Sequence, residues 1–124
     1  MSLLVDSDIL IEVSRGKDAD LLSRWREFSR SDTAILYSPV SMAEVWTGAR
    51  PSEHEAISNL FGALTCVPID AKIGRQAGDY LRHYRKSHGV GLGDALIAAS
   101  AVLNGATLWT RNRKHYPMRE VAFF

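Results

Sequence analysis

The chain has 124 residues, of which 46% are hydrophobic and 23% are charged. This composition is typical of one compact domain, and the chain is too short for two domains of ordinary size. Fifteen lysine and arginine residues against fourteen aspartate and glutamate residues give a formal net charge of +1. The protein therefore lacks the overall basic field that would draw it onto DNA or a membrane, and any polyanionic partner must be bound by local charge clusters.

The single cysteine and the absence of long apolar segments suggest where the protein works. Cys66 cannot form an intramolecular disulfide, which favours a reducing compartment. No apolar stretch approaches the roughly 18 to 20 residues that span a bilayer, and Met1–Val5 lacks the features of a signal peptide. We expect a cytoplasmic protein without membrane contact, with Cys66 buried in a strand as a small hydrophobe.

The first half of the chain alternates short apolar runs with helical patterns. Leu3–Val5 predicts a buried strand that ends at Asp6, and the apolar spacing after Asp18 predicts an amphipathic helix. Residues 34–37 predict a second strand. Ser41 is then expected to cap a helix that carries Glu44, because these two residue types three positions apart have the spacing of a capping box.

The second half continues the alternation. Its predicted elements, in order, are a helix over 56–64, an edge strand over 65–69, a helix capped by Asp70 that ends near Gly89, a glycine-rich turn over 91–94, a tightly packed helix over 95–103, a strand over 107–110, a loop over 112–116 and a last strand over 121–124. Strands that alternate with helices favour an α/β fold with a parallel sheet covered on both faces. We predict one domain over residues 1–124, with a ligand site beyond the carboxyl ends of the strands.

Three acidic residues stand where such a site is expected. Asp6 follows the first strand, Glu44 lies in the helix after the second strand, and Asp94 opens the helix after the glycine-rich turn. If they converge, each pair repels by about 4 kcal/mol at about 4 Å and an effective dielectric of about 20, so the cluster requires a cation. Each residue also has a structural interpretation: Asp6 as a turn former, Glu44 as half of a capping box and Asp94 as an N-cap.

The donor types favour a hard cation. Carboxylate oxygens select Mg²⁺ or Mn²⁺. The four histidines have no paired ligand spacing beside a cysteine, which disfavours zinc, and neither a P-loop nor a Rossmann glycine signature is present.

Four segments together resemble the motifs of PIN-domain proteins in both order and spacing: 4–11 (LVDSDILI), 41–44 (SMAE), 93–99 (GDALIAA) and 110–116 (TRNRKHY). The resemblance covers essentially the whole chain. Within the family, the chain most specifically resembles the VapC-type toxins of type II toxin–antitoxin systems. It implies a PIN-like three-layer α/β/α domain whose short, mainly parallel, twisted sheet is flanked by helices. It also implies a metal-dependent endoribonuclease that hydrolyses RNA phosphodiester bonds, forms a homodimer and is inhibited by a cognate antitoxin that covers the active site.

The resemblance assigns roles to individual residues. Asp6, Glu44 and Asp94 match the acidic metal-site positions, with Mg²⁺ or Mn²⁺ on Asp6 and Asp94 and with Glu44 positioning or deprotonating the attacking water. Family members often carry one more acidic residue where Asn112 or His115 stands here, so one ion and two ions both remain open. Asn112 and Thr110 are expected to orient a metal-bound water or Asp94 through hydrogen bonds.

The basic and aromatic residues are candidates for contacts with RNA and protein. Arg111, Arg113, Lys114 and His115 adjoin the expected site and are candidate RNA-binding residues, with a solvated loop as the alternative. The basic group Arg82, Arg85 and Lys86, on the helix that begins at Asp70 and ends near Gly89, is better explained as a solvated face. The tryptophans are expected in the core or in partner contacts, and the surfaces around Trp25 and Trp46 are candidates for the antitoxin interface.

Two other functions remain open at this level. Asp6-Ser7-Asp8 after an apolar strand resembles the nucleophile motif of haloacid-dehalogenase-like phosphatases, although a second acidic pair late in the chain is missing. A non-catalytic PIN-like module that binds RNA or a partner is the other alternative, and the altered segment 112–115 is its only support.

Overall fold

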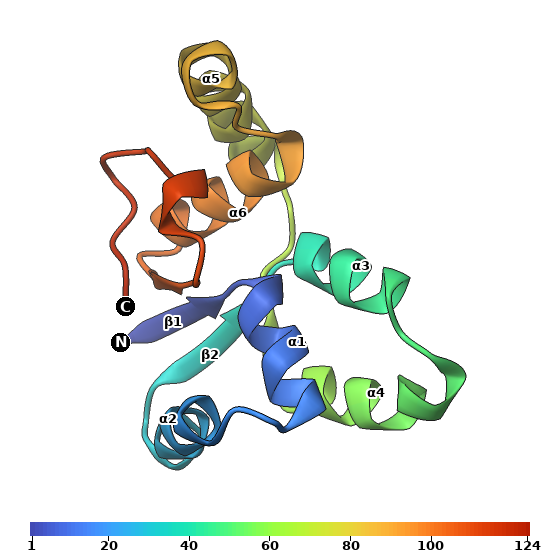
Figure 1. The fold of residues 1–124 in the computed structure, drawn as a ribbon. Coiled ribbons are helices and arrows are strands. Elements are labelled where there is room, and N and C mark those ends of the chain that lie inside the picture. The colour runs from blue at the N-terminus through green and yellow to red at the C-terminus, as the bar shows by residue number, and fades with distance from the viewer.

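The computed structural model describes all residues, 1–124, and its centre is a parallel sheet (Figure 1). The four strands lie in the order β3-β2-β1-β4, with β1 at Ser2–Val5, β2 at Ala34–Tyr37, β3 at Thr65–Cys66 and β4 at Thr107–Trp109. In the register, Leu3 of β1 lies beside Ile35 of β2 and Thr107 of β4. All strands are parallel, so their carboxyl ends meet at one edge.

Helices cover both faces of this sheet. Their bounds are α1 Ser7–Arg15, α2 Ala19–Arg30, α3 Pro39–Thr47, α4 His54–Gly62, α5 Ala71–His88 and α6 Leu92–Leu103, with 3₁₀ turns at Pro51–Glu53 and Arg113–His115. Figure 1 shows α5 and α6 on one side of β1 and β2, and α1, α2 and α4 on the other. The predicted three-layer α/β/α architecture is confirmed.

Strand β1 divides the core into two clusters. Successive strand residues point to opposite faces. Leu3 and Val5 accordingly pack in the cluster that includes Ile9 of α1 and Phe61 of α4, whereas Leu4 packs in the cluster formed with α5 and α6. All three strand residues are completely or almost completely buried, so β1 is the strand on which both helical layers assemble.

Two helix ends agree with the sequence patterns. The Asp18 carboxylate caps α2 by accepting a hydrogen bond from the Leu21 amide at 3.0 Å, and Asp70 caps α5 through the Ile73 amide at 3.0 Å. Helix α5 ends at Gly89, whose φ of 66° lies in the left-handed region that glycine adopts without strain.

Other helix starts differ from the prediction, and the differences concern the candidate site. Helix α3 begins at Pro39 with Ser38 as its N-cap, because proline suits the first helical position. Ser41 lies inside this helix, buried, and its hydroxyl has no hydrogen-bond partner. The capping-box interpretation of Glu44 is therefore wrong. Helix α6 begins at Leu92, which places Asp94 in its first turn and makes the N-cap interpretation wrong as well.

The remaining differences are at the sheet edges and in α1. The predicted strand over 65–69 is reduced to two residues, and Cys66 in it is exposed rather than buried. The predicted strand over 121–124 is a single bridge between Leu108 and Phe123. Helix α1 has no counterpart among the predicted elements. None of the helices combines the length and the apolar composition that crossing a bilayer requires.

Candidate active site

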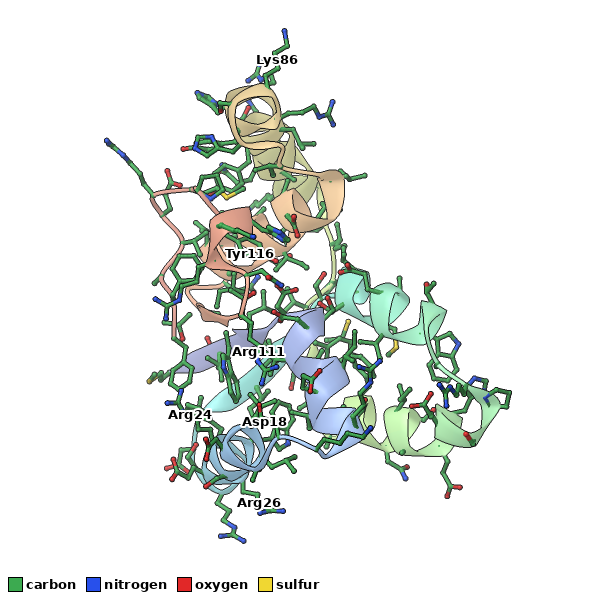
Figure 2. All side chains as sticks on the ribbon, in the orientation of Figure 1. Asp18, Arg24, Arg26, Lys86, Arg111 and Tyr116 are labelled. Carbon is green, nitrogen blue, oxygen red and sulfur yellow. The ribbon has the colours of Figure 1, made fainter.

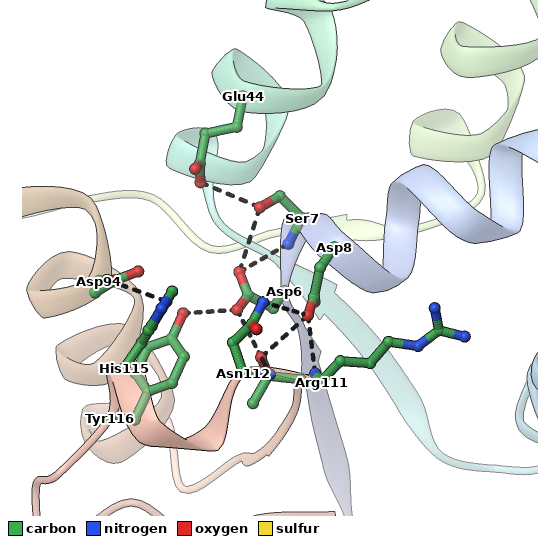
Figure 3. A network of polar contacts seen from close by, with 10 residues as sticks. Asp6, Ser7, Asp8, Glu44, Asp94, Arg111, Asn112, His115 and Tyr116 are labelled. Atoms are coloured by element: carbon green, nitrogen blue, oxygen red, sulfur yellow. Dashed lines mark hydrogen bonds and ion pairs between the residues drawn. The ribbon is translucent and has the colours of Figure 1, made fainter.

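Three acidic side chains from different elements lie at the carboxyl edge of the sheet (Figure 3). Asp6 directly follows β1 and is the N-cap of α1, because its carboxylate accepts a hydrogen bond from the Ser7 amide at 2.8 Å. Glu44 projects from α3, and Asp94 projects from the first turn of α6. The parallel topology thus brings together residues that are far apart in the sequence.

Asp6 is the most tightly held of the three. Its side chain is buried, with only 6% of the residue exposed. One carboxylate oxygen accepts hydrogen bonds from the Thr110 hydroxyl at 2.9 Å and from the Tyr116 hydroxyl at 2.7 Å. Both carboxylate oxygens of Asp6 accept hydrogen bonds, which fixes its orientation as a metal-binding or reacting carboxylate requires.

Two hydroxyl groups connect the three carboxylates. The Ser7 hydroxyl lies 3.3 Å from a Glu44 oxygen and 3.4 Å from an Asp6 oxygen. The Tyr116 hydroxyl, which donates to Asp6, also lies against Asp94 and partly offsets the rise in the pKa of that carboxyl. The carboxylates are therefore separated by single hydroxyl groups within one polar network.

The electrostatics of this network disfavour negative charge. Burial raises the pKa of Glu44, and the neighbouring Asp6 charge raises it further. Burial also raises the pKa of Asp94, although the His115 imidazole, 3.7 Å from its carboxylate, opposes that rise. Tyr116 stays protonated because burial and the Asp6 charge both raise the pKa of its hydroxyl. At neutral pH the edge holds like charges that a cation would stabilise.

The chemistry of this donor set fits a magnesium or manganese ion. The carboxylates of Asp6, Glu44 and Asp94 offer oxygen ligands, which hard dications prefer. As placed, no three acidic, histidine or cysteine side chains surround a common point. Mg²⁺ usually contacts only one or two carboxylates directly and keeps several waters, so a site of this kind does not need three direct carboxylate ligands.

Asp8 belongs to the same network, although no sequence pattern assigns it a role there. It lies in the first turn of α1, where one carboxylate oxygen accepts a hydrogen bond from the Ile9 amide at 2.8 Å. The other oxygen accepts from the Arg111 amide at 2.8 Å and from the Asn112 side-chain amide at 3.1 Å. Burial raises the pKa of Asp8, and the bond from Arg111 opposes that rise. Its position two residues after Asp6, at a helix start, was the available signal.

The segment after β4 places Thr110 and Asn112 on Asp6 and Asp8. Thr110 is buried, and its hydroxyl donates to Asp6 and accepts a hydrogen bond from the Asn112 backbone amide at 3.0 Å. The side chain of Asn112 bonds to Asp8 and makes no hydrogen bond to Asp94, which Tyr116 and His115 contact instead. Tyr116 belongs to the segment 110–116, but the sequence pattern gives it no individual role.

The four candidate RNA-binding residues have different surroundings. The Arg111 guanidinium points away from the carboxylates and pairs with Asp18 at the start of α2 (Figures 2 and 3). Arg113 donates to the Phe124 carbonyl at 2.9 Å and lies over the Phe123 ring. Lys114 is exposed and forms no ion pair, and His115 lies beside Asp94 as described above. Lys114 and His115 are thus the basic side chains of this segment that are not engaged elsewhere.

The other basic and aromatic candidates lie outside this network. Arg82 on α5 pairs with Asp79 at 2.6 Å, and Lys86 projects from the far end of α5 (Figure 2). Trp25 stacks on Trp109 at the edge of the core, at a ring distance of 6.2 Å. Trp46 is 42% exposed and stacks on His54, so it presents an aromatic surface on the same helix as Glu44.

Comparison with known proteins gives consistent results. A family model described as PIN domain matches residues 3–123. The chain is 41% identical over 119 residues to Ribonuclease VapC10 of Mycobacterium tuberculosis, which covers 95% of this chain and 88% of that relative. It is 34% identical over 116 residues to Ribonuclease VapC19 of the same organism, covering 93% and 92%. The crystal structure of VapBC2 from Rickettsia felis bound to a DNA fragment has a TM-score of 0.85 over 100% of this chain and 98% of that chain, and its 20% identity makes this a similarity of fold.

Proposed function

The chain belongs to the PIN-domain family and to its VapC branch, and from this premise we propose that it is a metal-dependent endoribonuclease toxin that hydrolyses RNA phosphodiester bonds and is inhibited by a cognate antitoxin. The relatives that support this proposal are named ribonucleases. The observation that carries it is the meeting of Asp6, Glu44 and Asp94 at one edge of the sheet, inside a network of oxygen donors.

Asp6 and Asp94 are the residues we assign to a bound Mg²⁺ or Mn²⁺. When bound, such an ion polarises a phosphoryl oxygen and lowers the pKa of a water. Thr110, Ser7 and Tyr116 hold the Asp6 carboxylate in one orientation. This preorganisation matters because a small misplacement of a reacting group lowers the rate substantially.

Glu44 is assigned to the attacking water. Its carboxylate is fixed only by the Ser7 hydroxyl, so its other oxygen is available to orient a water or to accept its proton. Burial and the Asp6 charge raise the pKa of Glu44, which makes its carboxylate a stronger base than an exposed one. A base with a pKa closer to the working pH is more effective in proton transfer.

Lys114 and His115 are our candidates for contact with the RNA backbone near the carboxylates. Lys114 forms no ion pair and His115 lies beside Asp94 within the site, whereas the Arg111 guanidinium is paired with Asp18 and Arg113 is bound to the C-terminal segment. Cationic side chains at this position would offset the charge that develops on the leaving oxygen.

We also propose that the antitoxin covers the carboxyl edge of the sheet and contacts the exposed ring of Trp46. The solved structure of the Rickettsia felis relative is of a VapBC assembly. Trp46 lies on α3 together with Glu44, and large exposed aromatic rings are frequent anchors of protein interfaces. The expected homodimer and the cytoplasmic location stay predictions.

The test is cleavage of an end-labelled RNA pool by the purified wild type and by Asp6→Asn in Mn²⁺ and in EDTA. We expect the wild type to cleave in Mn²⁺ only, and Asp6→Asn to lose on the order of 10³-fold in rate, because it removes a charged metal ligand. Asp20→Asn, an exposed residue of α2, is the matched control and should cleave like the wild type.

The same assay separates the two alternatives. A wild type that binds RNA but cleaves no better than Asp6→Asn would indicate a non-catalytic PIN-like module. Release of phosphate from p-nitrophenyl phosphate without RNA cleavage would indicate the phosphatase, which family membership does not support.

A further inference from the structure

We propose that Asp8 is a positioning residue of the active site, which fixes the segment after β4 against Asp6 and sets the orientation of the Asn112 side chain. The inference rests on the proposed function, because it concerns the same carboxylate edge. It goes beyond that function by giving a role to a carboxylate that the three-acid site does not use.

The contacts of Asp8 are with a segment that lies more than a hundred positions away in the sequence. The Asp8 Oδ2 atom accepts hydrogen bonds from the Arg111 backbone amide at 2.8 Å and from the Asn112 side-chain amide at 3.1 Å, and the Thr110 hydroxyl lies 3.5 Å from it. The Asp8 Oδ1 atom accepts a hydrogen bond from the Ile9 amide at 2.8 Å. A single side chain therefore anchors Arg111 and Asn112 to the first turn of α1, beside Thr110.

This anchor determines which way the Asn112 amide faces. A carboxylate accepts hydrogen bonds and an amide nitrogen donates them, so the nitrogen of Asn112 must face Asp8. The amide oxygen then has no donor within the chain and remains available as an acceptor in the network of Figure 3. Without Asp8, neither orientation of this amide is selected.

The anchor also reaches Asp6 through Thr110. The backbone amide of Asn112 donates to the Thr110 hydroxyl, and that hydroxyl donates to Asp6. A hydroxyl accepts through a lone pair and donates its one proton, so Thr110 can accept from Asn112 while it donates to Asp6. Asp8 thus holds the residues that orient a metal-site carboxylate. Substituting a residue that orients a metal ligand in this way typically lowers metal affinity by about 10- to 100-fold.

The first test is Mn²⁺ titration of wild type and Asp8→Asn by calorimetry, well below the melting temperature of either. An asparagine at position 8 must point its NH₂ group at either the Ile9 amide or the Arg111 amide, so one donor faces another. We expect the affinity for Mn²⁺ to fall by about tenfold or more.

A matched control separates positioning from stability. Asp70→Asn replaces another aspartate that accepts a backbone hydrogen bond at a helix start, outside the network of Figure 3. It should lower the melting temperature and leave the Mn²⁺ affinity unchanged. If Asp8→Asn also lowers only the melting temperature, Asp8 is merely structural and the inference is wrong.

The second test uses the charge of the pair and needs no metal. In EDTA, Asn112→Asp places two carboxylates against each other and should lower the melting temperature. Adding Asp8→Asn should then raise the melting temperature again, because the amide at position 8 donates to the carboxylate at position 112. Asp8→Asn is thus expected to destabilise the wild type and to stabilise Asn112→Asp.

The outcomes distinguish this inference from the proposed function. A wild type that binds no Mn²⁺ would overturn the proposed metal site, whereas the melting experiment in EDTA would still test the Asp8–Asn112 contact. A wild type that binds Mn²⁺, together with additive effects of the two substitutions in EDTA, would overturn the inference alone.

Discussion

The interior of the sheet and its carboxyl edge are built from the same chain segments but have opposite energetics. In the interior, β1 and β4 place Leu3, Leu4 and Leu108 between two helical layers, where burial of apolar surface stabilises the fold. One or two residues further on, the same strands lead to Asp6 and Thr110, where carboxylates are collected and partly desolvated. Burial raises the pKa of Glu44 and of Asp94, so their negative charges oppose folding in the absence of a cation.

This difference shows how stability and function are distributed in the molecule. The apolar layers fix the directions of β1, β4 and α6, and the positions of the acidic residues follow from those directions. The polar network then fixes the orientation of Asp6 and Asp8 through hydroxyl and amide donors. Substitutions in the two regions should therefore separate changes in stability from changes in metal binding.

The largest effect on stability is expected for Phe61→Ala in the interior. Phe61 is 3% exposed and packs edge-on against Tyr37 at a ring distance of 4.7 Å. Truncating a buried phenylalanine typically lowers the free energy of unfolding by about 3–5 kcal/mol. Urea denaturation of Phe61→Ala measures this loss. Its affinity for Mn²⁺, measured while the variant is folded, should equal that of the wild type.

A milder substitution keeps this prediction testable if Phe61→Ala does not fold. Phe61→Leu should lower stability by a smaller amount with the same unchanged affinity. A loss of Mn²⁺ binding in a folded Phe61 variant would contradict the separation of the two regions.

A smaller effect, of opposite sign, is expected at the edge for Glu44→Gln in EDTA. Because the folded state raises the pKa of Glu44, the penalty for its negative charge is present at neutral pH and disappears as the pH falls through the folded pKa. Glu44→Gln should therefore melt a few degrees higher than the wild type at neutral pH, and this advantage should shrink towards acidic pH.

Two comparisons sharpen the Glu44 prediction. Saturating Mn²⁺ should raise the melting temperature of the wild type more than that of Glu44→Gln, because the ion offsets the carboxylate charge. Glu55→Gln, an exposed residue of α4, should show neither effect. A difference between Glu44→Gln and wild type that does not vary with pH would contradict the electrostatic account of the edge.

The smallest expected effect is on RNA affinity. RNA binding is measured in the catalytically inactive Asp6→Asn protein. Adding Lys114→Ala should weaken RNA binding a few-fold. It should also reduce the slope of log affinity against log salt by roughly 1, as expected for the loss of one phosphate contact. Arg111→Ala should change the slope less, because Asp18 already pairs with its guanidinium. Equal salt slopes for the two variants would show that neither side chain is a preferred phosphate contact.

Much of the fold follows from local patterns in the sequence. The run Leu3–Val5 is buried on both faces and predicted β1 correctly, and the N-caps Asp18 and Asp70 marked real helix starts. These features are determined by neighbours in the sequence. Helix α1 was missed because Ile9, Leu10 and Ile11 form a continuous apolar run, in which helical periodicity is hard to recognise.

The site could be predicted only in part, because its details depend on contacts between distant segments. The acidic residues Asp6, Glu44 and Asp94 stood out by position relative to strands and helices. The contact of Asp8 with Arg111 and Asn112 depends on α1 and the segment after β4 meeting at one edge, which no local pattern encodes. Ser41 shows that a local pattern can also predict a contact that does not form. Its spacing to Glu44 is that of a capping box, but Ser38 is the N-cap of α3.

The most direct measurement is a crystal structure of the wild type grown with Mn²⁺, with diffraction data collected at a wavelength where manganese scatters anomalously. The proposed site predicts an anomalous peak at the carboxyl edge of the sheet, bound by Asp6 and Asp94, that disappears in Asp6→Asn. A structure in which Mn²⁺ is absent from this edge, or in which the peak persists unchanged in Asp6→Asn, would contradict the metal site on which the proposed ribonuclease activity depends.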